Sequence, residues 1–382
     1  MSFRYASAIN KPGFNPLGAQ TSTTTYYPYL YSWGNNGSGQ LGIGSTVYKS
    51  SPNQVGSLST WAQVSTGLRQ AISVKTDGTL WSWGSNAGGG LGLGNLTSYS
   101  SPVQIGALTN WLTPSGNRDY SFAIKTDGTL WSWGLNTNGT LGLGNITSYS
   151  SPKQIGSLTT WAKISTGGWY HAGAIKTNGT LWMWGINNNG QLGLGNITYY
   201  SSPKQVGALT AWLSVSCGQY HTIAVQTNGT LWSWGRNNSG QLGLGNTTYY
   251  SSPKQIGALT TWAQSSTATR TTLAVTKTGS LYAWGLGTYG ALGLGNQTDY
   301  SSPMQVGALT SWSSVSCGAG FTIATQTNQT MWSWGRNNSG QLGLNLSVYT
   351  NKSSPTQIGS STTWFSVAAA GGGGEFVAAL LY

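Results

Sequence analysis

Charged side chains are scarce in this sequence, and acidic ones most of all. Only 6% of the 382 residues are charged, and 17 Lys and Arg stand against 5 Asp and Glu, which gives a formal net charge of +12. Five dispersed carboxylates and two histidines offer little for acid–base catalysis, and two histidines without a third donor do not make a zinc site. We therefore expect no enzyme, no metal site and no cofactor.

Runs of basic residues and long apolar runs are also missing. Nucleic-acid-binding proteins usually gather Lys and Arg in one stripe, so we expect no specific nucleic-acid partner. No segment is apolar enough over about 20 residues to cross a bilayer, and residues 1–17 lack the apolar core of a signal peptide. We expect no membrane insertion, and a cytoplasmic location unless the chain is part of a larger particle.

The sequence does contain a strong internal repeat. The dipeptide Trp-Gly returns every 50 residues, with one step of 51, at Trp33, Trp83, Trp133, Trp184, Trp234, Trp284 and Trp334. A proline and then a second tryptophan follow each copy, and these columns hold nearly all of the tryptophans. A period in this range indicates a repeat architecture, and the aromatic content belongs first to its scaffold.

Each repeat has the pattern of four short strands. In the fifth copy we place them at residues 212–216, 222–226, 230–234 and 253–256, with Asn228-Gly229 as a type I′ hairpin turn between the second and the third. Strand side chains alternate, so Trp232 and Trp234 should share one face and Leu231 the other. Large rings on one face and small residues on the other allow successive units to stack.

The two ends of the repeat region complement each other. Residues 29–34 resemble a third strand without its first two, and residues 364–382 resemble the first two strands of a repeat. Together they complete one unit, which removes the open edges of the array. The predicted fold is therefore all-β: a closed seven-bladed β-propeller of four-stranded blades over residues 29–382, whose N- and C-terminal strands share one blade. Residues 1–28 should form an extended arm with apolar anchors at Phe3, Tyr5, Phe14 and Leu17.

The segment from Val215 to Thr222, followed by Trp234-Gly235 and by Asn238 to Gly243, resembles the repeat of the regulator of chromosome condensation family. The resemblance covers residues 29–382 and implies a seven-bladed propeller. It also implies possible roles in guanine-nucleotide exchange or chromatin association. Members with exchange activity use an inserted loop and a basic tail, whereas these repeats have constant length and the tail carries only Arg4 and Lys11.

Two pairs of residues stand in shared columns of the repeat. His171 and His221 occupy one column, and the resemblance implies a hydrogen bond within the blade for each. Cys217 and Cys317 occupy another column two repeats apart, too far for the Cα separation of about 4.4–6.8 Å that a disulfide needs. We expect two small buried thiols.

Candidate binding residues fall in two groups. Tyrosines amid Asn, Thr and Ser precede each proline, a composition typical of adaptable recognition surfaces, although the rings could instead pack between blades. The second group departs from the strict repeat, where specificity can reside. The first group is Tyr99, Tyr149, Tyr199, Tyr200, Tyr249, Tyr250 and Tyr300; the second is Trp169, Tyr170, Arg236 and Arg336.

We interpret the chain as a non-enzymatic structural or adhesive binding module. The leading hypothesis is a virus or phage virion component, a capsid decoration or tail-fibre protein held by residues 1–28 and bound to other virion proteins. The alternative is a regulator of nucleotide exchange or chromatin, as the resemblance implies. A second alternative is a carbohydrate-binding lectin or a secreted protein inhibitor, in which the tyrosines would stack on glycans.

Overall fold

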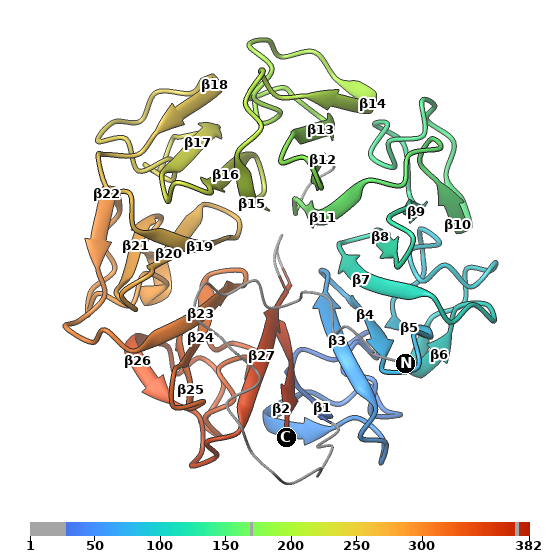
Figure 1. Cartoon of the computed structure of the whole chain (residues 1–382). Helices are drawn as coiled ribbons and strands as arrows, with labels where there is room; N and C mark the ends of the chain where they lie inside the picture. Colours follow the sequence, from blue (N-terminus) through green and yellow to red (C-terminus); the bar gives the residue numbers. More distant parts are fainter. Residues whose placement is uncertain (1–27, 169–170, 371–373) are drawn as a thin grey trace, which may run out of the picture.

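The repeats form a ring of seven antiparallel four-stranded sheets (Figure 1). The computed structural model describes residues 28–168, 171–370 and 374–382. Each sheet is one blade, and six of the seven blades are built from four strands in chain order. The prediction of an all-β, closed seven-bladed propeller is confirmed.

The strands lie in four concentric positions, from the centre of the ring to its rim (Figure 1). The innermost strands are β3 (Trp61–Thr66), β7 (Trp111–Gly116), β11 (Trp161–Thr166), β15 (Trp212–Cys217), β19 (Trp262–Thr267), β23 (Trp312–Cys317) and β27 (Trp364–Ala369). The second strands are β4 (Gln70–Lys75), β8 (Tyr120–Lys125), β12 (His171–Lys176), β16 (His221–Gln226), β20 (Thr271–Thr276), β24 (Phe321–Gln326) and β28 (Phe376–Leu381).

The third strands are β5 (Leu80–Gly84), β9 (Leu130–Gly134), β13 (Leu181–Gly185), β17 (Leu231–Gly235), β21 (Leu281–Gly285), β25 (Met331–Gly335) and β1 (Tyr29–Gly34). The outer strands are β6 (Tyr99–Gln104), β10 (Tyr149–Gln154), β14 (Tyr200–Gln205), β18 (Tyr250–Gln255), β22 (Tyr300–Gln305), β26 (Lys352–Gln357) and β2 (Lys49–Gln54). Within the described residues the one helix is a single 3₁₀ turn, η1 (Thr288–Gly290), and no helix there could span a membrane.

Ring closure follows the predicted scheme. Strand β1 pairs with β28 along its whole length, with Leu30 opposite Leu380, and the closing blade has the order β2-β1-β28-β27. The first and last strands of the repeat region thus lie side by side in one sheet (Figure 1). Residues 1–27, which include the predicted anchors Phe3, Tyr5, Phe14 and Leu17, lie outside the described residues.

Blades stack through their tryptophans, as the strand alternation predicts. Trp234 is fully buried and, with the half-buried Trp232, packs against residues of the preceding blade such as Met183. Leu231, on the other face, packs with Trp262 of the following blade. Each Trp-Gly indole also donates its N–H to a carbonyl of the preceding long loop, for example Trp234 Nε1 to the Gln191 oxygen (2.9 Å).

A second line of contacts joins neighbouring innermost strands. The Ser165 hydroxyl accepts the backbone N–H of Cys217 in the next blade (3.1 Å), and Ser266 does the same for Cys317 (3.0 Å). Both cysteines are buried free thiols, as predicted, and burial raises the pKa of each to about 12. These thiols are parts of the packed interior between blades.

Three local predictions are wrong. The hairpin at Asn228-Gly229 is not type I′, because only Gly229 has a positive φ (80°) and its N–H donates to the Gln226 carbonyl. The outer strand of that blade, β18, begins at Tyr250 rather than at residue 253. The repeats are also not constant in length, since the chain from Trp334 to Pro355 is two residues longer than the same stretch in the other blades.

Candidate functional site

The two ends of the ring carry different connections. The hairpins between first and second strands and the long loops between third and outer strands share one end. The residue after each third strand shows this, because its N–H donates to the inner hairpin, as Arg236 does to Tyr220 (2.8 Å) and Arg336 to Gly320 (2.8 Å). The hairpins between second and third strands lie at the opposite end.

Every arginine of the described residues lies at the first of these ends, which we call the arginine face. Arg69, Arg118 and Arg270 stand in inner hairpins, and Arg236 and Arg336 open the long loops of their blades. Two lysines also lie at this end, since Lys49 and Lys352 begin outer strands opposite Gly34 and Gly335. Other lysines lie elsewhere. Lys75, Lys125 and Lys176 end second strands, where each ammonium lies 3.7–3.9 Å from the centre of a third-strand tryptophan ring.

The carboxylates of the arginine face neutralise it only in part. Arg118 pairs with Asp119 (3.1 Å) and Arg336 with Glu375 (2.9 Å). Burial raises the pKa of Asp119, against the opposing effect of Arg118 and Arg69. Among the residues that the structure describes, Arg69, Arg236 and Arg270 have no carboxylate partner. The face therefore presents surplus positive charge held on planar guanidinium groups.

Arg336 is the centre of a small polar and aromatic cluster on this face. Its guanidinium lies 5.2 Å from the ring centre of Tyr289 in the preceding blade, while it pairs with Glu375. The Glu375 carboxylate also accepts hydrogen bonds from Ser339 Oγ (2.8 Å) and Asn338 Nδ2 (3.3 Å). Arg336 is thus fixed in position, and Tyr289 remains 43% exposed beside it.

Two exposed tyrosines in the long loops of adjacent blades have left-handed backbones. Tyr289 has φ 62°, and Tyr349, in the long loop extended by two residues, has φ 69°. Tyr349 is 76% exposed, and its N–H donates to the Asn337 carbonyl (2.8 Å). An aromatic residue in this region of φ is strained, and such strain often marks a functional site. The sequence signals were Tyr289 at a position of small polar residues and the longer final loop; neither was recognised.

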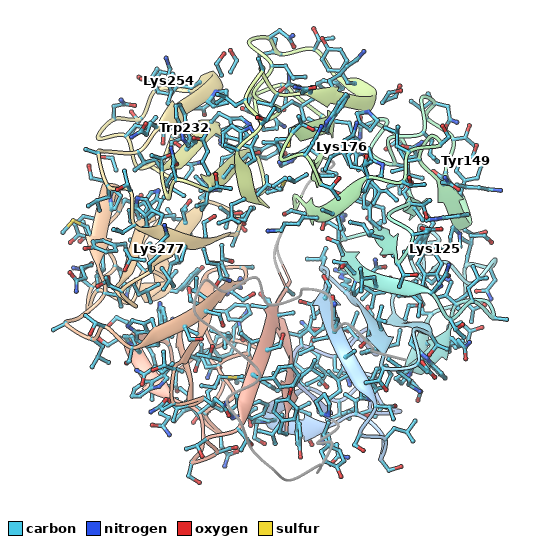
Figure 2. The ribbon with its side chains drawn as sticks, in the orientation of Figure 1. Lys125, Tyr149, Lys176, Trp232, Lys254 and Lys277 are labelled. Atoms are coloured by element: carbon cyan, nitrogen blue, oxygen red, sulfur yellow. The ribbon has the colours of Figure 1, made fainter. Side chains whose placement is uncertain are left out.

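The tyrosine column predicted for recognition is half-buried at the start of the outer strands. The hydroxyls of Tyr99, Tyr149, Tyr200, Tyr250 and Tyr300 each accept a hydrogen bond from the asparagine four residues earlier, at 3.1–3.5 Å. Their rings pack at the rim, and Lys254 lies 5.4 Å from the Tyr250 ring centre. Tyr149 and Lys254 lie at the periphery (Figure 2). Only Tyr199 and Tyr249, 47% and 44% exposed, point outward from the preceding loops.

The predicted residues that break the repeat divide between the described and undescribed parts of the chain. Arg236 lies on the arginine face with its guanidinium 5.5 Å from the Tyr220 ring centre. Arg336 lies in the cluster with Tyr289. Trp169 and Tyr170 lie outside the described residues. The structure therefore places both arginines at the same end of the ring, apart from the tyrosines packed at the rim.

The histidines form no metal site, and their hydrogen bonds differ from the expectation. His221 Nε2 bonds to Thr272 Oγ1 (3.1 Å) and His171 Nε2 to Thr222 Oγ1 (3.3 Å), so each bond reaches the next blade instead of staying within its own. In the described part of the chain, no group of three or more His, Cys, Asp or Glu side chains could hold a metal ion.

The sequence matches the profile of the regulator of chromosome condensation (RCC1) repeat seven times. The matched residues are 29–73, 77–124, 127–175, 178–225, 228–275, 278–325 and 329–380. The chain belongs to this repeat family. A second profile of the same repeat matches residues 161–191, 212–241 and 312–341. The comparison with curated proteins found no match.

Several solved structures share the fold at low sequence identity. Prp20p of Saccharomyces cerevisiae, described with its binding to Gsp1p and histones, is 19% identical with a TM-score of 0.84 over 94% of this chain and 92% of its own. Human WBSCR16 is 19% identical with a TM-score of 0.82 over 93% and 98%. Yeast Prp20 bound to Kap60 is 18% identical with a TM-score of 0.81 over 94% and 89%. At such identity the likeness shows the fold alone.

Proposed function

We propose that this RCC1-repeat propeller is a non-enzymatic regulator that binds a partner protein on its arginine face. The observation that carries the proposal is the cluster of Arg336 and Tyr289, with the exposed Tyr349 on the same long loop as Arg336. Arginine and tyrosine are the residue types most enriched in binding hot spots. A fixed guanidinium also loses little conformational entropy when it binds a carboxylate.

The partner surface should be acidic. Among the described residues, two of the five arginines on this face form ion pairs with carboxylates and three form none, although Arg69 also acts on Asp119, whose pKa it lowers. This surplus positive charge would meet the negative charge of a partner. Complementary charge chiefly raises the association rate, and salt screens it. The association rate should therefore fall as ionic strength rises, while the aromatic anchors should mainly govern dissociation.

Membership in the repeat family favours the regulator alternative over the virion hypothesis. The virion hypothesis was motivated by an arm at residues 1–28, by the lack of a signal-peptide pattern and by a surface rich in Asn, Thr and Ser; almost all of the arm lies outside the described residues. Prp20p binds Gsp1p and histones according to its description. We propose the same broad class of partner here, a folded regulatory or chromosomal protein, with nucleotide exchange on a small GTPase as one possible consequence of binding.

The test is affinity capture from the native source followed by binding measurements with the purified partner. We expect Arg336→Ala and Tyr289→Ala each to weaken binding by roughly tenfold or more, as hot-spot truncations do. Lys254→Ala, on the outer strand β18, serves as the matched control and should bind like the unaltered protein. Urea unfolding would verify that the Arg336→Ala variant keeps its fold after losing the ion pair between Arg336 and Glu375.

Two results would contradict the proposal. One is unchanged binding by both variants of the arginine face; the other is loss of binding in the Lys254 variant alone. A nucleotide-release assay with small GTPases separates the narrower exchange function from binding. Binding without accelerated nucleotide release would support the arginine face as a docking surface and would exclude the exchange function.

A further inference from the structure

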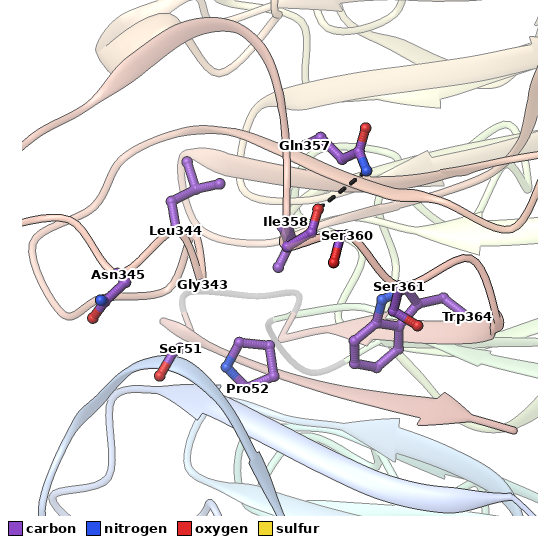
Figure 3. Close-up of a pocket in the computed structure, with 11 residues that line it drawn as sticks. Ser51, Pro52, Gly343, Leu344, Asn345, Gln357, Ile358, Ser360, Ser361 and Trp364 are labelled. Carbon is purple, nitrogen blue, oxygen red and sulfur yellow. Dashed lines mark hydrogen bonds between the residues drawn. The ribbon is translucent and has the colours of Figure 1, made fainter.

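A pocket opens where the last repeat meets the closing blade. Its volume is about 440 Å³, within the range of about 300–1,000 Å³ typical of small-molecule sites. Segments far apart in the sequence line it: Ser51 and Pro52 of β2, residues 343–345 of the last long loop, residues 357–361, and Trp364 at the start of β27. Figure 3 shows Trp364 and Asn345 on opposite sides of the pocket, with Pro52 between them.

This pocket is one copy of a groove that the repeat also makes elsewhere. The equivalent groove before β23 is lined by Gly295, Leu309 and Trp312, with Ser354 and Pro355 in the positions of Ser51 and Pro52, and its volume is about 340 Å³. The lining of the seam pocket, as we name the larger one, differs from this copy at several positions: Ile358 replaces Val306, Ser360 lines only the seam pocket, and Trp332 lines only the other groove. Two further differences introduce polar side chains, because Asn345 replaces Gly295 and Ser361 replaces Leu309.

Both replacements put a polar side chain where the other repeats carry a leucine or a glycine. Six repeats carry a leucine in the column of Ser361, at Leu58, Leu108, Leu158, Leu209, Leu259 and Leu309, each 47–51% exposed. Six repeats carry a glycine with a left-handed backbone in the column of Asn345, at Gly44, Gly94, Gly144, Gly195, Gly245 and Gly295. Only the seam combines a hydroxyl and a side-chain amide in these columns.

Asn345 keeps the left-handed backbone of the glycines it replaces, with φ 54°. Its N–H donates to the Ser50 carbonyl (2.8 Å), the bond that Gly295 makes to Ser353 (2.8 Å), so the backbone is locked by the loop. Asparagine tolerates this conformation better than most residues but not as well as glycine. A polar side chain is therefore retained at the mouth of the pocket against a small conformational cost, and such outliers often mark functional sites.

The lining indicates the chemistry of the ligand. None of the eleven lining residues is charged, which argues against an ionic ligand. Pro52 and Leu344 offer partly exposed apolar surfaces over a floor formed by the buried Ile358 and Trp364, while Ser51, Ser360 and Ser361 offer hydroxyls. The Gln357 amide nitrogen donates to the Gly359 carbonyl (3.1 Å; Figure 3), which leaves its oxygen as an acceptor. Apolar faces bordered by neutral donors and acceptors match a ring with apolar faces and a hydroxylated edge.

We propose that the seam pocket binds a pyranose ring of a neutral saccharide. Leu344 and Pro52 would contact the faces of the ring above the buried Trp364. Ser361, Gln357 and the Asn345 amide, whose oxygen already accepts a weak hydrogen bond from Ser50 Oγ (3.4 Å), would bond its hydroxyl groups. Saccharide binding would be a further function beside partner binding on the arginine face, although residues 343–345 of the pocket belong to the long loop that also carries Arg336 and Tyr349. In the copies of this groove, the leucine in the column of Ser361 replaces its hydroxyl with apolar bulk.

The repeat itself supplies the variants for a test. Ser361→Leu and Asn345→Gly each restore the residue that six other repeats carry, so both proteins should fold. The probes are glucose, galactose, mannose, N-acetylglucosamine and maltose, followed by saturation-transfer difference NMR and calorimetry on the full chain. We expect saturable binding of at least one probe with a Kd on the order of 1 mM, weakened at least tenfold by each variant.

Glucuronate is the charged control and should bind no better than glucose, because the lining holds no cation. Leu309→Ser, in the neighbouring groove, should leave binding at the seam unchanged. The proposal is overturned if none of the five sugars binds saturably, or if a sugar binds equally well to the unaltered protein and to both seam variants. The second result would place the saccharide site elsewhere, for example at the exposed tyrosines of the long loops.

Discussion

His221 shows how one buried side chain can make the whole ring sensitive to acid. It is fully buried at the start of β16 and shares its hydrogen bond with Thr272 of the next blade. Burial, together with the nearby His171, lowers the pKa of His221 to about 3. The neutral imidazole therefore belongs to the folded state, whereas in the unfolded chain the same group takes up a proton below about pH 6.5.

We predict that the free energy of unfolding falls as the pH drops from about 6.5 towards 3. In this window the unfolded chain binds a proton at His221 that the folded protein does not, which contributes a slope of up to about 1.4 kcal/mol per pH unit. His221→Phe should flatten this slope, and phenylalanine is already accommodated in that column at Phe321 and Phe376. Urea unfolding at several pH values would measure it; equal slopes for both proteins would contradict the assignment.

Single residues also show the limit of prediction from a repetitive sequence. The columns of Trp234 and Tyr250 could be recognised in the sequence because each residue recurs with the period. The half-buried position of Tyr250 could not be predicted in the same way. Tyr289 and Tyr349 each occur once, and nothing in their neighbours announces a left-handed backbone. Periodicity therefore identifies the scaffold well, and it identifies least well the residues that depart from it, which are the candidates for function.

At the scale of the element, the long loop links neighbouring blades through hydrogen bonds. Asn237 is fully buried at its start, where it accepts the Leu242 N–H (2.9 Å) and donates to the Asn246 carbonyl (2.9 Å). The far side of the loop reaches the following blade, where the Gly245 N–H donates to the Ser301 carbonyl (2.8 Å). One side chain thus shapes a loop that holds two blades together.

We predict that Asn237→Ala destabilises the protein by about 1–3 kcal/mol, because it leaves the buried Leu242 N–H without its partner. The bond to the Asn246 carbonyl is also lost, but that group is only partly buried and water can replace the bond. Asn238→Ala, at the exposed neighbouring position, is the matched control and should cost under about 1 kcal/mol. The midpoint of urea unfolding measures both. Similar midpoints for the two variants would show that water or loop rearrangement replaces the lost bonds.

The hairpins show what the sequence can predict about an element. Asn-Gly and Asp-Gly marked the positions of the turns correctly, since both dipeptides favour tight turns. The turn type depends on which residue takes positive φ, and here Asn228 instead accepts the N–H and hydroxyl of Thr230 (3.0 and 2.8 Å). That local competition by a side chain cannot be read from the dipeptide alone.

At the scale of the whole molecule, stability depends on the closing blade. β28 supplies Phe376, Val377 and Leu380, all fully buried, and pairs with β1 on one side and β27 on the other. Burying each of these side chains is worth about 1.5–3 kcal/mol. Their sum is comparable to the whole stability of an ordinary domain, about 5–15 kcal/mol.

Deletion of residues 376–382 should therefore abolish cooperative unfolding and expose the edges of β1 and β27 to aggregation. Tyr382→Ala, a change at the exposed end of this segment, is the control and should leave the transition cooperative. Calorimetry with size-exclusion chromatography would measure both effects. A soluble truncated protein with an unchanged transition would mean that six blades and an open sheet suffice.

The pairing of β1 with β28 also determines how late the ring can close during protein synthesis. Strand β1 leaves the ribosome early, but its partner follows only roughly 350 residues later, which at about 5–20 residues per second is a delay of roughly 20–70 seconds. During that time the growing arc has one unpaired edge of β1, whose other edge pairs with β2, at one end and an unfinished blade at the other. A nascent chain of this protein should therefore be a substrate for chaperones that shield sheet edges until the last strand arrives.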